Sequence, residues 1–366
     1  MEEKIWWNNV MNASRYIDDI TDCLLNNQSI VLTGSDIIPW RSTMRDLVGG
    51  MVRAMNSQRT LRRIEDNQGN PGKYIMEKFC KEEKRARYRP SIGYAEFLAQ
   101  SDDLVLNNVY VWVSVISPER LGLWTQFVIE YHRHVKKGQN PGVFILETSS
   151  FEQTNSKKHL KNISIVDYIG QYDVYIFNTL LSSSIHQSNY YKQYLSEVAA
   201  NIAGADAEFS ARCIDIGSEF LLNPYSTVCN IVNSSVNSNG SDFVFQMTES
   251  EVNKCVWKAQ IKILFPLIEE YREKFIVDYN DKIISYLPID TYYGETISEP
   301  NDIDIGPLWI LVYNKRMGVS HHDYECIDVC RNARNQLAHI RTLSLEAVEE
   351  IFKFLIADTS DAYEKK

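Results

Sequence analysis

The stretch NVYVWVSVI (108–116) is apolar almost throughout and decides the fold of the first half of this chain. A short apolar run without alternation predicts a strand that is covered on both faces, as in parallel sheets. We expect further strands at SIVLTG (29–34), GVFILET (142–148) and YDVYIFN (172–178). Amphipathic helices are predicted between and around them, at 12–27, 40–56, 72–87, 94–100 and 118–135. This alternation predicts an α/β domain with a largely parallel sheet.

The second half of the chain has a different pattern. Residues 188–222 are helical in periodicity, and SSVNSNGSD (234–242) is the most linker-like segment. Beyond it nearly everything is predicted to be helical, including a long helix at about 250–278. We therefore expect an α/β domain over 1–185, a helical lid and linker over 186–242, and an all-α domain over 243–366.

The composition excludes several classes of protein. The chain has 366 residues, enough for about two domains, and 38 basic against 48 acidic residues give a net charge of −10. This balance argues against a protein that coats nucleic acid over its whole surface. No apolar run approaches the roughly 18 residues of a membrane span, and the N-terminus does not resemble a signal peptide. With seven irregularly spaced cysteines, we expect a cytoplasmic protein with reduced thiols and no membrane partner.

A phosphate-binding loop would belong after the first strand, but the sequence there departs from the motif. The motif needs two glycines, so that backbone N–H groups can approach the phosphates, followed by a lysine. In GSDIIPWRST (34–43) the second glycine is replaced by Pro39 and the lysine by Trp40. The strand at 108–116 also lacks a terminal carboxylate for a metal ion. We therefore expect no cofactor and no ATP hydrolysis; Arg41 either meets an anion at the helix start or belongs to a surface cap.

The order of strands and helices over roughly residues 10–235 resembles an AAA+ or STAND-type P-loop core with a helical lid. The resemblance is one of pattern and not of motif. It implies a degenerate NTPase fold that has lost its nucleotide chemistry.

One segment of the acidic chain is basic. Residues 59–89 contain ten basic and five acidic side chains, and Tyr74, Phe79 and Tyr88 lie among them. Cations interleaved with aromatic rings are typical of single-stranded nucleic-acid binding. Mixed charge is equally typical of a solvated helix face. The candidate nucleic-acid-binding residues are Arg59, Arg62, Arg63, Lys84, Arg85, Arg87 and Arg89.

The sharpest motif is CRNARNQLAHI (330–340), in which Arg334 and Asn335 precede His339 by five and four positions. In its helical context it resembles the HEPN domain family of prokaryotic defence proteins, over about residues 245–360. Metal-free RNA cleavage needs a group near pKa 6.5 for proton transfer and a cation for the developing phosphorane charge. His339 suits the first role and Arg334 the second, and Asn335 can orient the phosphate or the imidazole. Residues five apart on a helix lie about 140° apart around its axis; the resemblance implies a composite site in a dimer.

Other interpretations of this region remain open. Asn335 and His339 can simply cap or bridge helices, and residues 249–366 carry 21 acids and 14 bases, an unfavourable field for RNA. His321, His322, Cys326 and Cys330 have helical spacing but lack a fourth zinc ligand at standard spacing, which favours buried thiols over a metal.

Two functional hypotheses follow. The first is a prokaryotic antiviral-defence or stress effector that cleaves RNA without metal, as a homodimer formed through the C-terminal domain. The second is a non-catalytic scaffold or sensor, in which the pseudo-NTPase domain binds a defence-system protein and the HEPN-like domain mediates dimerisation.

Overall fold

The computed structural model describes residues 1–100, 105–152, 159–290, 294 and 296–363. These residues form two compact units. Unit 1 comprises Met1–Phe177, Ala205–Glu208 and Val236–Asp242. Unit 2 comprises Asn178–Gly204, Phe209–Ser235 and Phe243–Lys366. The contacts therefore group the segment 186–242 mainly with the C-terminal part of the chain.

Unit 1 is built on a five-stranded sheet in which every strand pair is parallel, which confirms the predicted α/β class. The strand order is β2-β3-β4-β1-β5, so β1 lies between β4 and β5. The three central strands are the ones expected from their apolar runs. The strands are β1 (Ser29–Thr33), β2 (Thr60–Glu65), β3 (Val109–Ile116), β4 (Val143–Thr148) and β5 (Leu160–Ser164).

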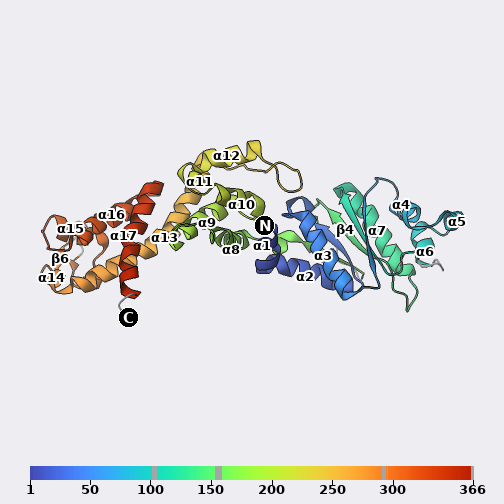
Figure 1. The fold of residues 1–366 in the computed structure, drawn as a ribbon, viewed down its shortest axis with the longest axis horizontal. Coiled ribbons are helices and arrows are strands. Elements are labelled where there is room, and N and C mark those ends of the chain that lie inside the picture. Colours follow the sequence, from blue (N-terminus) through green and yellow to red (C-terminus); the bar gives the residue numbers. More distant parts are fainter. Residues whose placement is uncertain (101–104, 153–158, 291–293, 295, 364–366) are drawn as a thin grey trace. The chain divides into compact units, whose positions relative to one another are not determined.

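Helices cover both faces of this sheet (Figure 1). Successive strand residues point to opposite faces. Val111 of β3 and Phe144 of β4 accordingly pack in one cluster with Trp124 and Phe127 of α7 (Pro118–His134). α4 (Pro71–Phe79) and α6 (Tyr94–Ala99) join the same cluster, whereas α2 packs against β1 and α3. The other helices of this region are α1 (Glu2–Asn9), α2 (Met11–Leu25), α3 (Arg41–Met55) and α5 (Glu82–Arg85).

The prediction of a strand at 172–178 is wrong, because these residues belong to helix α8 (Gln171–Ser182). Asp173, Val174, Phe177 and Asn178 are buried, which is the three- and four-residue period of a helix. An apolar run this short does not distinguish a buried strand from a buried helix. The predicted helix over 72–87 is also interrupted and forms α4 and α5.

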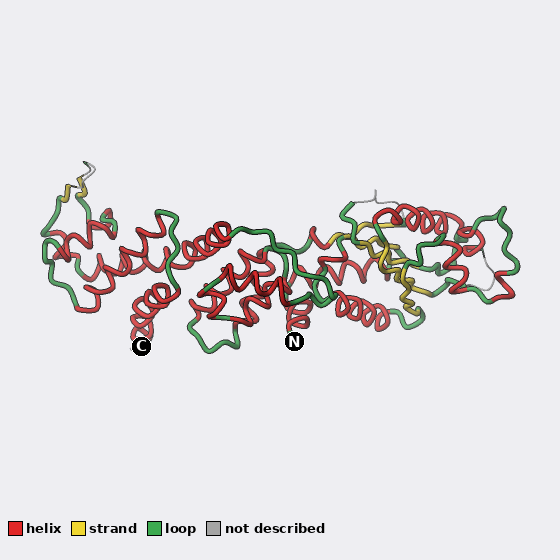
Figure 2. The backbone as a smooth tube through the Cα atoms, turned by 90° about the horizontal axis from the view of Figure 1, so that it is seen from above, coloured by secondary structure: helices red, strands yellow, loops and turns green. Residues whose placement is uncertain are grey.

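Unit 2 is almost entirely helical (Figure 2). Its longest helix is α13 (Glu249–Asp278), which begins at a capping box of Thr248 and Glu251 and packs against α9, α16 and α17. The fully buried Gln260 of α13 donates to the carbonyl of Leu343 (2.9 Å) and accepts from its N–H (2.9 Å). The remaining elements are α9 (Asn189–Ala203), α10 (Ala207–Ile216), α11 (Ser218–Leu222), α12 (Pro224–Ser234), α14 (Asn280–Ile284), β6 (Ile289–Asp290), β7 (Thr296–Ile297), α15 (Ile305–Tyr313), α16 (His321–Ala338) and α17 (Leu345–Tyr363).

Within the described ranges, no helix has both the length and the apolar composition needed to cross a bilayer.

Candidate functional site

The first candidate is the turn after β1, where a phosphate loop would lie. Gly34 has a φ of 70°, and a Cβ atom there would lie 2.9 Å from the ring of Phe151. The N-cap of α3 is Trp40, also in the left-handed region at φ 43°. The Trp40 N–H donates to the carboxylate of Glu208 at 2.6 Å. A carboxylate of the protein itself therefore occupies the start of α3.

A second internal carboxylate lies at the carboxyl end of β4, the strand beside β1. The Glu147 side chain is 1% exposed. It accepts two hydrogen bonds from Arg45 of α3, at 2.9 and 2.5 Å, and one from Trp112 Nε1 at 2.8 Å. Arg41 Nε lies 3.7 Å from the same carboxylate. The cations in the first turns of α3 are thus neutralised from within, and Arg41 meets a protein carboxylate.

The basic segment contributes less to the surface than its sequence suggests. Arg59 is buried and donates to the carbonyl of Pro141 (2.9 Å) and to Asn27 Oδ1 (2.5 Å). Its guanidinium lies 5.1 Å from the ring centre of Tyr110. This arginine attaches the start of β2 to its neighbours, and its burial keeps it from contact with nucleic acid.

The other predicted cations of the segment differ in exposure. Lys84 is 9% exposed and Arg85 is half-buried. Arg63 donates to Asp46 Oδ1 (2.8 Å) and to the carbonyl of Arg45 (2.6 Å). Within the described residues, three candidates are exposed and form no ion pair with a carboxylate: Arg62, Arg87 and Arg89.

In unit 2 the motif residues lie at the end of α16. Arg334 is half-exposed and donates to Asp304 Oδ2 at 2.6 Å. Asp304 in turn caps α15 by accepting the N–H of Ile305 at 2.8 Å. The pair ties α16 to α15, but at this exposure an ion pair contributes little stability, and Arg334 can exchange its partner at small cost.

Asn335 and His339 lie further along the same helix. Asn335 is half-buried and lines a concavity, whereas His339 is exposed and forms the C-cap of α16. The two residues are one turn apart, so their side chains share a face. Arg334 and His339 do not share a face, as the five-residue spacing predicts.

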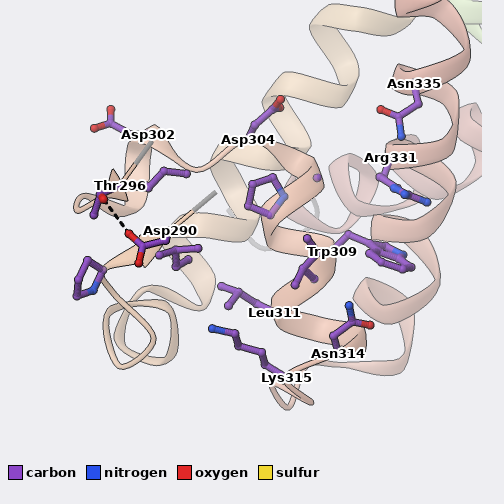
Figure 3. A pocket seen from close by; sticks show the side chains of 16 residues that line it. Asp290, Thr296, Asp302, Asp304, Trp309, Leu311, Asn314, Lys315, Arg331 and Asn335 are labelled. Atoms are coloured by element: carbon purple, nitrogen blue, oxygen red, sulfur yellow. Dashed lines mark hydrogen bonds between the residues drawn. The ribbon is translucent and has the colours of Figure 1, made fainter. Parts of the chain in front are cut away.

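The concavity beside Asn335 has a volume of about 1060 Å³ and lies between the paired strands β6 and β7, α15 and α16 (Figure 3). Its polar lining combines carboxylates with cations. Trp309 of α15 forms part of the wall, and the Arg331 guanidinium lies over its ring at 4.4 Å from the centre. The charged residues that line it are Asp290, Asp302, Asp304, Lys315 and Arg331.

Sequence reasoning missed Arg331. It precedes Asn335 by four residues and His339 by eight, so the three follow one face of α16. This spacing is present in the sequence. The contact between Arg331 and Trp309 cannot be read from the sequence, because it depends on how α15 packs against α16.

The cysteine and histidine residues at the start of α16 do not form a metal site. Cys326 and Cys330 are fully buried with their sulfur atoms 3.9 Å apart. A hydrogen bond from Cys326, together with burial, raises the pKa of the Cys330 thiol well above its ordinary value. His321 is exposed and lies 3.4 Å from Glu325. No group of three potential metal ligands occurs among the residues that the structure describes.

Comparisons with known proteins assign no family. No protein-family model matches the sequence, and no curated protein matches it. One similar solved structure is the ORC2 protein of Aeropyrum pernix, with 12% identity over 95% of this chain and 93% of that chain, at a TM-score of 0.32. Another is PCH-2 of C. elegans, with 12% identity over 71% of this chain and 68% of that chain, at a TM-score of 0.28. These scores are low, and the fold rests on the strand order and helix packing above.

Proposed function

We propose that the chain is a prokaryotic antiviral-defence or stress effector whose second unit cleaves RNA without a metal ion, at a site completed by a second copy. The observation that carries the proposal is the end of α16, where the exposed His339 lies one turn from Asn335. Arg331 and Arg334 of the same helix are both partly exposed. The resemblance of this motif to the HEPN family supports the same chemistry.

The reaction would be an internal transesterification. A neutral imidazole takes the proton of the ribose 2′-OH, and the 2′ oxygen forms a bond to phosphorus as the bond to the 5′ oxygen breaks. A protonated imidazole gives its proton to the departing 5′ oxygen, and a guanidinium stabilises the charge on the phosphorane. Two copies of His339 can act as base and acid, and Arg334 of either copy can supply the cation. A single copy of α16 cannot place both groups on one phosphate, because Arg334 and His339 lie on different faces of the helix.

The first unit would then position RNA or a protein partner rather than hydrolyse a nucleotide. Its sheet and helices resemble a P-loop core in pattern, but Glu147 and Glu208 hold the groups at the start of α3 that a phosphate would need. Both carboxylates are buried. This arrangement supports a pseudo-NTPase scaffold.

The test is cleavage of an end-labelled single-stranded RNA by the purified protein in the presence of EDTA. We expect cleavage by the wild type and none by His339→Ala. The matched control is His321→Ala, which removes an exposed histidine at the other end of the same helix and should cleave normally. Equal cleavage by His339→Ala, or no cleavage by the wild type, would refute the proposal. Light scattering should give a dimer.

The second candidate function is a non-catalytic scaffold or sensor that dimerises and binds a defence-system protein. The observation that favours it is the three aspartates lining the concavity beside Asn335, one of which holds Arg334. Carboxylates in this position oppose binding of a phosphate backbone. This candidate predicts a stable complex with a protein partner and no RNA cleavage.

A further inference from the structure

Four side chains on α15 and α16 form a stacked column. The rings of Trp309 and Tyr313 are stacked with their centres 4.9 Å apart, and those of Tyr313 and Tyr324 are stacked at 4.3 Å. The Arg331 guanidinium lies over the Trp309 ring. All four side chains are exposed or half-buried. A column of this kind at a surface presents planar groups whose positions are set before any ligand binds.

Arg331 is held by its surroundings without being neutralised. Its Nη1 donates to Asn332 Oδ1 at 3.1 Å, and among the described residues no carboxylate forms an ion pair with it. Trp309 is fixed in turn, because its Nε1 donates to Asp328 Oδ1 at 2.6 Å. Arg331 therefore combines a full positive charge with a guanidinium plane supported from behind by an aromatic ring.

The position of Arg331 relative to the motif connects this column to the proposed reaction. Arg331, Asn335 and His339 follow one face of α16 at intervals of one turn. Arg331 and His339 are separated by about 12 Å along the axis, which is between three and four steps of a stacked nucleotide strand at ~3.4 Å each. Asn335 lies between them and lines the same concavity as Arg331 and Trp309.

We infer that this face of α16 is a binding track for single-stranded RNA, in which an unpaired base stacks on Arg331. Guanidinium planes and aromatic rings are the groups on which proteins stack unpaired RNA bases. A base on Arg331 places the following nucleotides along Asn335 toward His339. The inference rests on the proposed function and adds the substrate class, because a base inside a duplex cannot stack on a side chain.

Several carboxylates lie beside this face. Asp304 pairs with Arg334 and caps α15, and Asp328 accepts from Trp309 and from Asn332. Asp290 and Asp302 also line the concavity and oppose a phosphate there, so the inference rests on stacking of a base on Arg331. Binding should weaken with salt, because each phosphate that a guanidinium of this face contacts releases its counterions. The net negative charge of residues 249–366 lowers the affinity at every salt concentration.

The experiment measures binding separately from cleavage. The probe is a fluorescein-labelled 2′-O-methyl oligoadenylate, which cannot be cleaved, and the readout is fluorescence anisotropy at low salt with the full-length chain. Stacking on one side chain contributes about 1–3 kcal/mol per base, so Arg331→Ala should weaken binding at least about fivefold. Arg331→Lys retains the charge but loses the plane, and we expect a similar loss. The charge-matched control is Lys353→Ala, an exposed cation on α17, which should change affinity less than twofold, on the order of a rim charge.

Each outcome decides the inference. If Arg331→Lys binds the probe as tightly as the wild type, only the charge of Arg331 matters and the inference is overturned. If the wild type binds the same oligonucleotide equally well in a duplex, the inference is also overturned. RNA cleavage by the wild type with unchanged binding in Arg331→Ala would overturn the track and leave the proposed function standing. Binding that depends on Arg331, without cleavage of natural RNA, would support the track and refute the nuclease. No binding by the wild type would overturn the track, as would conversion of a dimer to a monomer by Arg331→Ala, which would identify this face as a protein contact.

Discussion

Substituting Glu147 by glutamine tests whether an internal carboxylate has replaced the phosphate at the start of α3. The side chain is 1% exposed and accepts from Arg45 and Trp112, with Arg41 nearby. Removing one partner of a buried ion pair costs about 3–5 kcal/mol, because the remaining charge is left without compensation. Arg41 and Arg45 are 20% and 22% exposed, so water solvates them in part. We expect a loss of about 3 kcal/mol, at the lower end of that range.

The measurement is urea unfolding followed by tryptophan fluorescence, which reports mainly on unit 1 because five of the seven tryptophans lie there. The control is Asp46→Asn. Asp46 pairs with Arg63 at 2.8 Å but is 68% exposed, and its loss should cost less than about 1 kcal/mol. A loss below about 1 kcal/mol in Glu147→Gln would refute the view that this carboxylate neutralises α3.

The same variant has a second readout. Once the carboxylate is neutral, Arg45 lacks its anion and Arg41 keeps only the exposed Asp36, 3.4 Å from its Nη1. Inorganic phosphate should therefore stabilise Glu147→Gln more than the wild type. Equal stabilisation of both proteins by phosphate, or tight ATP binding by the wild type, would contradict a site that the protein fills itself.

Two further predictions concern unit 1. Burial, with a smaller effect of His159, lowers the pKa of His132 to about 4; because folding favours the neutral imidazole, stability should be complete above pH 6.5 and fall by about 3 kcal/mol as the pH drops to 4. Denaturation curves across this range should show that fall in the wild type and a flatter profile in His132→Gln. Gly72→Ala should destabilise the protein by about 3 kcal/mol, the upper end of the usual cost of overpacking, because its Cβ would collide with Tyr94 Cβ. Gly50→Ala, in open space on the exposed side of α3, should instead stabilise it by roughly 0.5–1 kcal/mol, and thermal unfolding of both variants checks the contrast.

The fold was predictable where a strand is buried on both faces. β1, β3 and β4 are central, and their apolar runs indicated them. β2 and β5 are the outer strands, and their sequences TLRRIE and LKNIS contain polar residues at positions that are exposed or half-buried, so neither forms a continuous apolar run. The strand predicted at 172–178 is part of helix α8. A short apolar run indicates that a segment is buried, but it does not indicate whether the segment is a strand or a helix.

The candidate site was predictable in part. The spacing of Arg334, Asn335 and His339 already placed them on one helix with the arginine on a different face. The ion pair of Arg334 with Asp304, thirty residues earlier in the chain, was not predictable, because it depends on the packing of α15 against α16. Arg331 has the spacing of the track, but a helical arginine is ordinarily a solvated side chain. The ring of Trp309 beneath its guanidinium distinguishes it from Arg334 on the same helix, which pairs with Asp304.

The sequence by itself determined that this chain has a parallel α/β part and a helical part, and that the residues for phosphate binding are missing after β1. These are local properties, because strand burial, helical period and motif residues are all read from neighbours in the chain. The tertiary structure decided what takes the place of the missing groups. Glu147 comes from a strand 102 residues beyond Arg45, and Glu208 from a segment 168 residues beyond Trp40. A carboxylate becomes the partner of a distant cation only when the fold buries both together, since burial makes a lone charge costly.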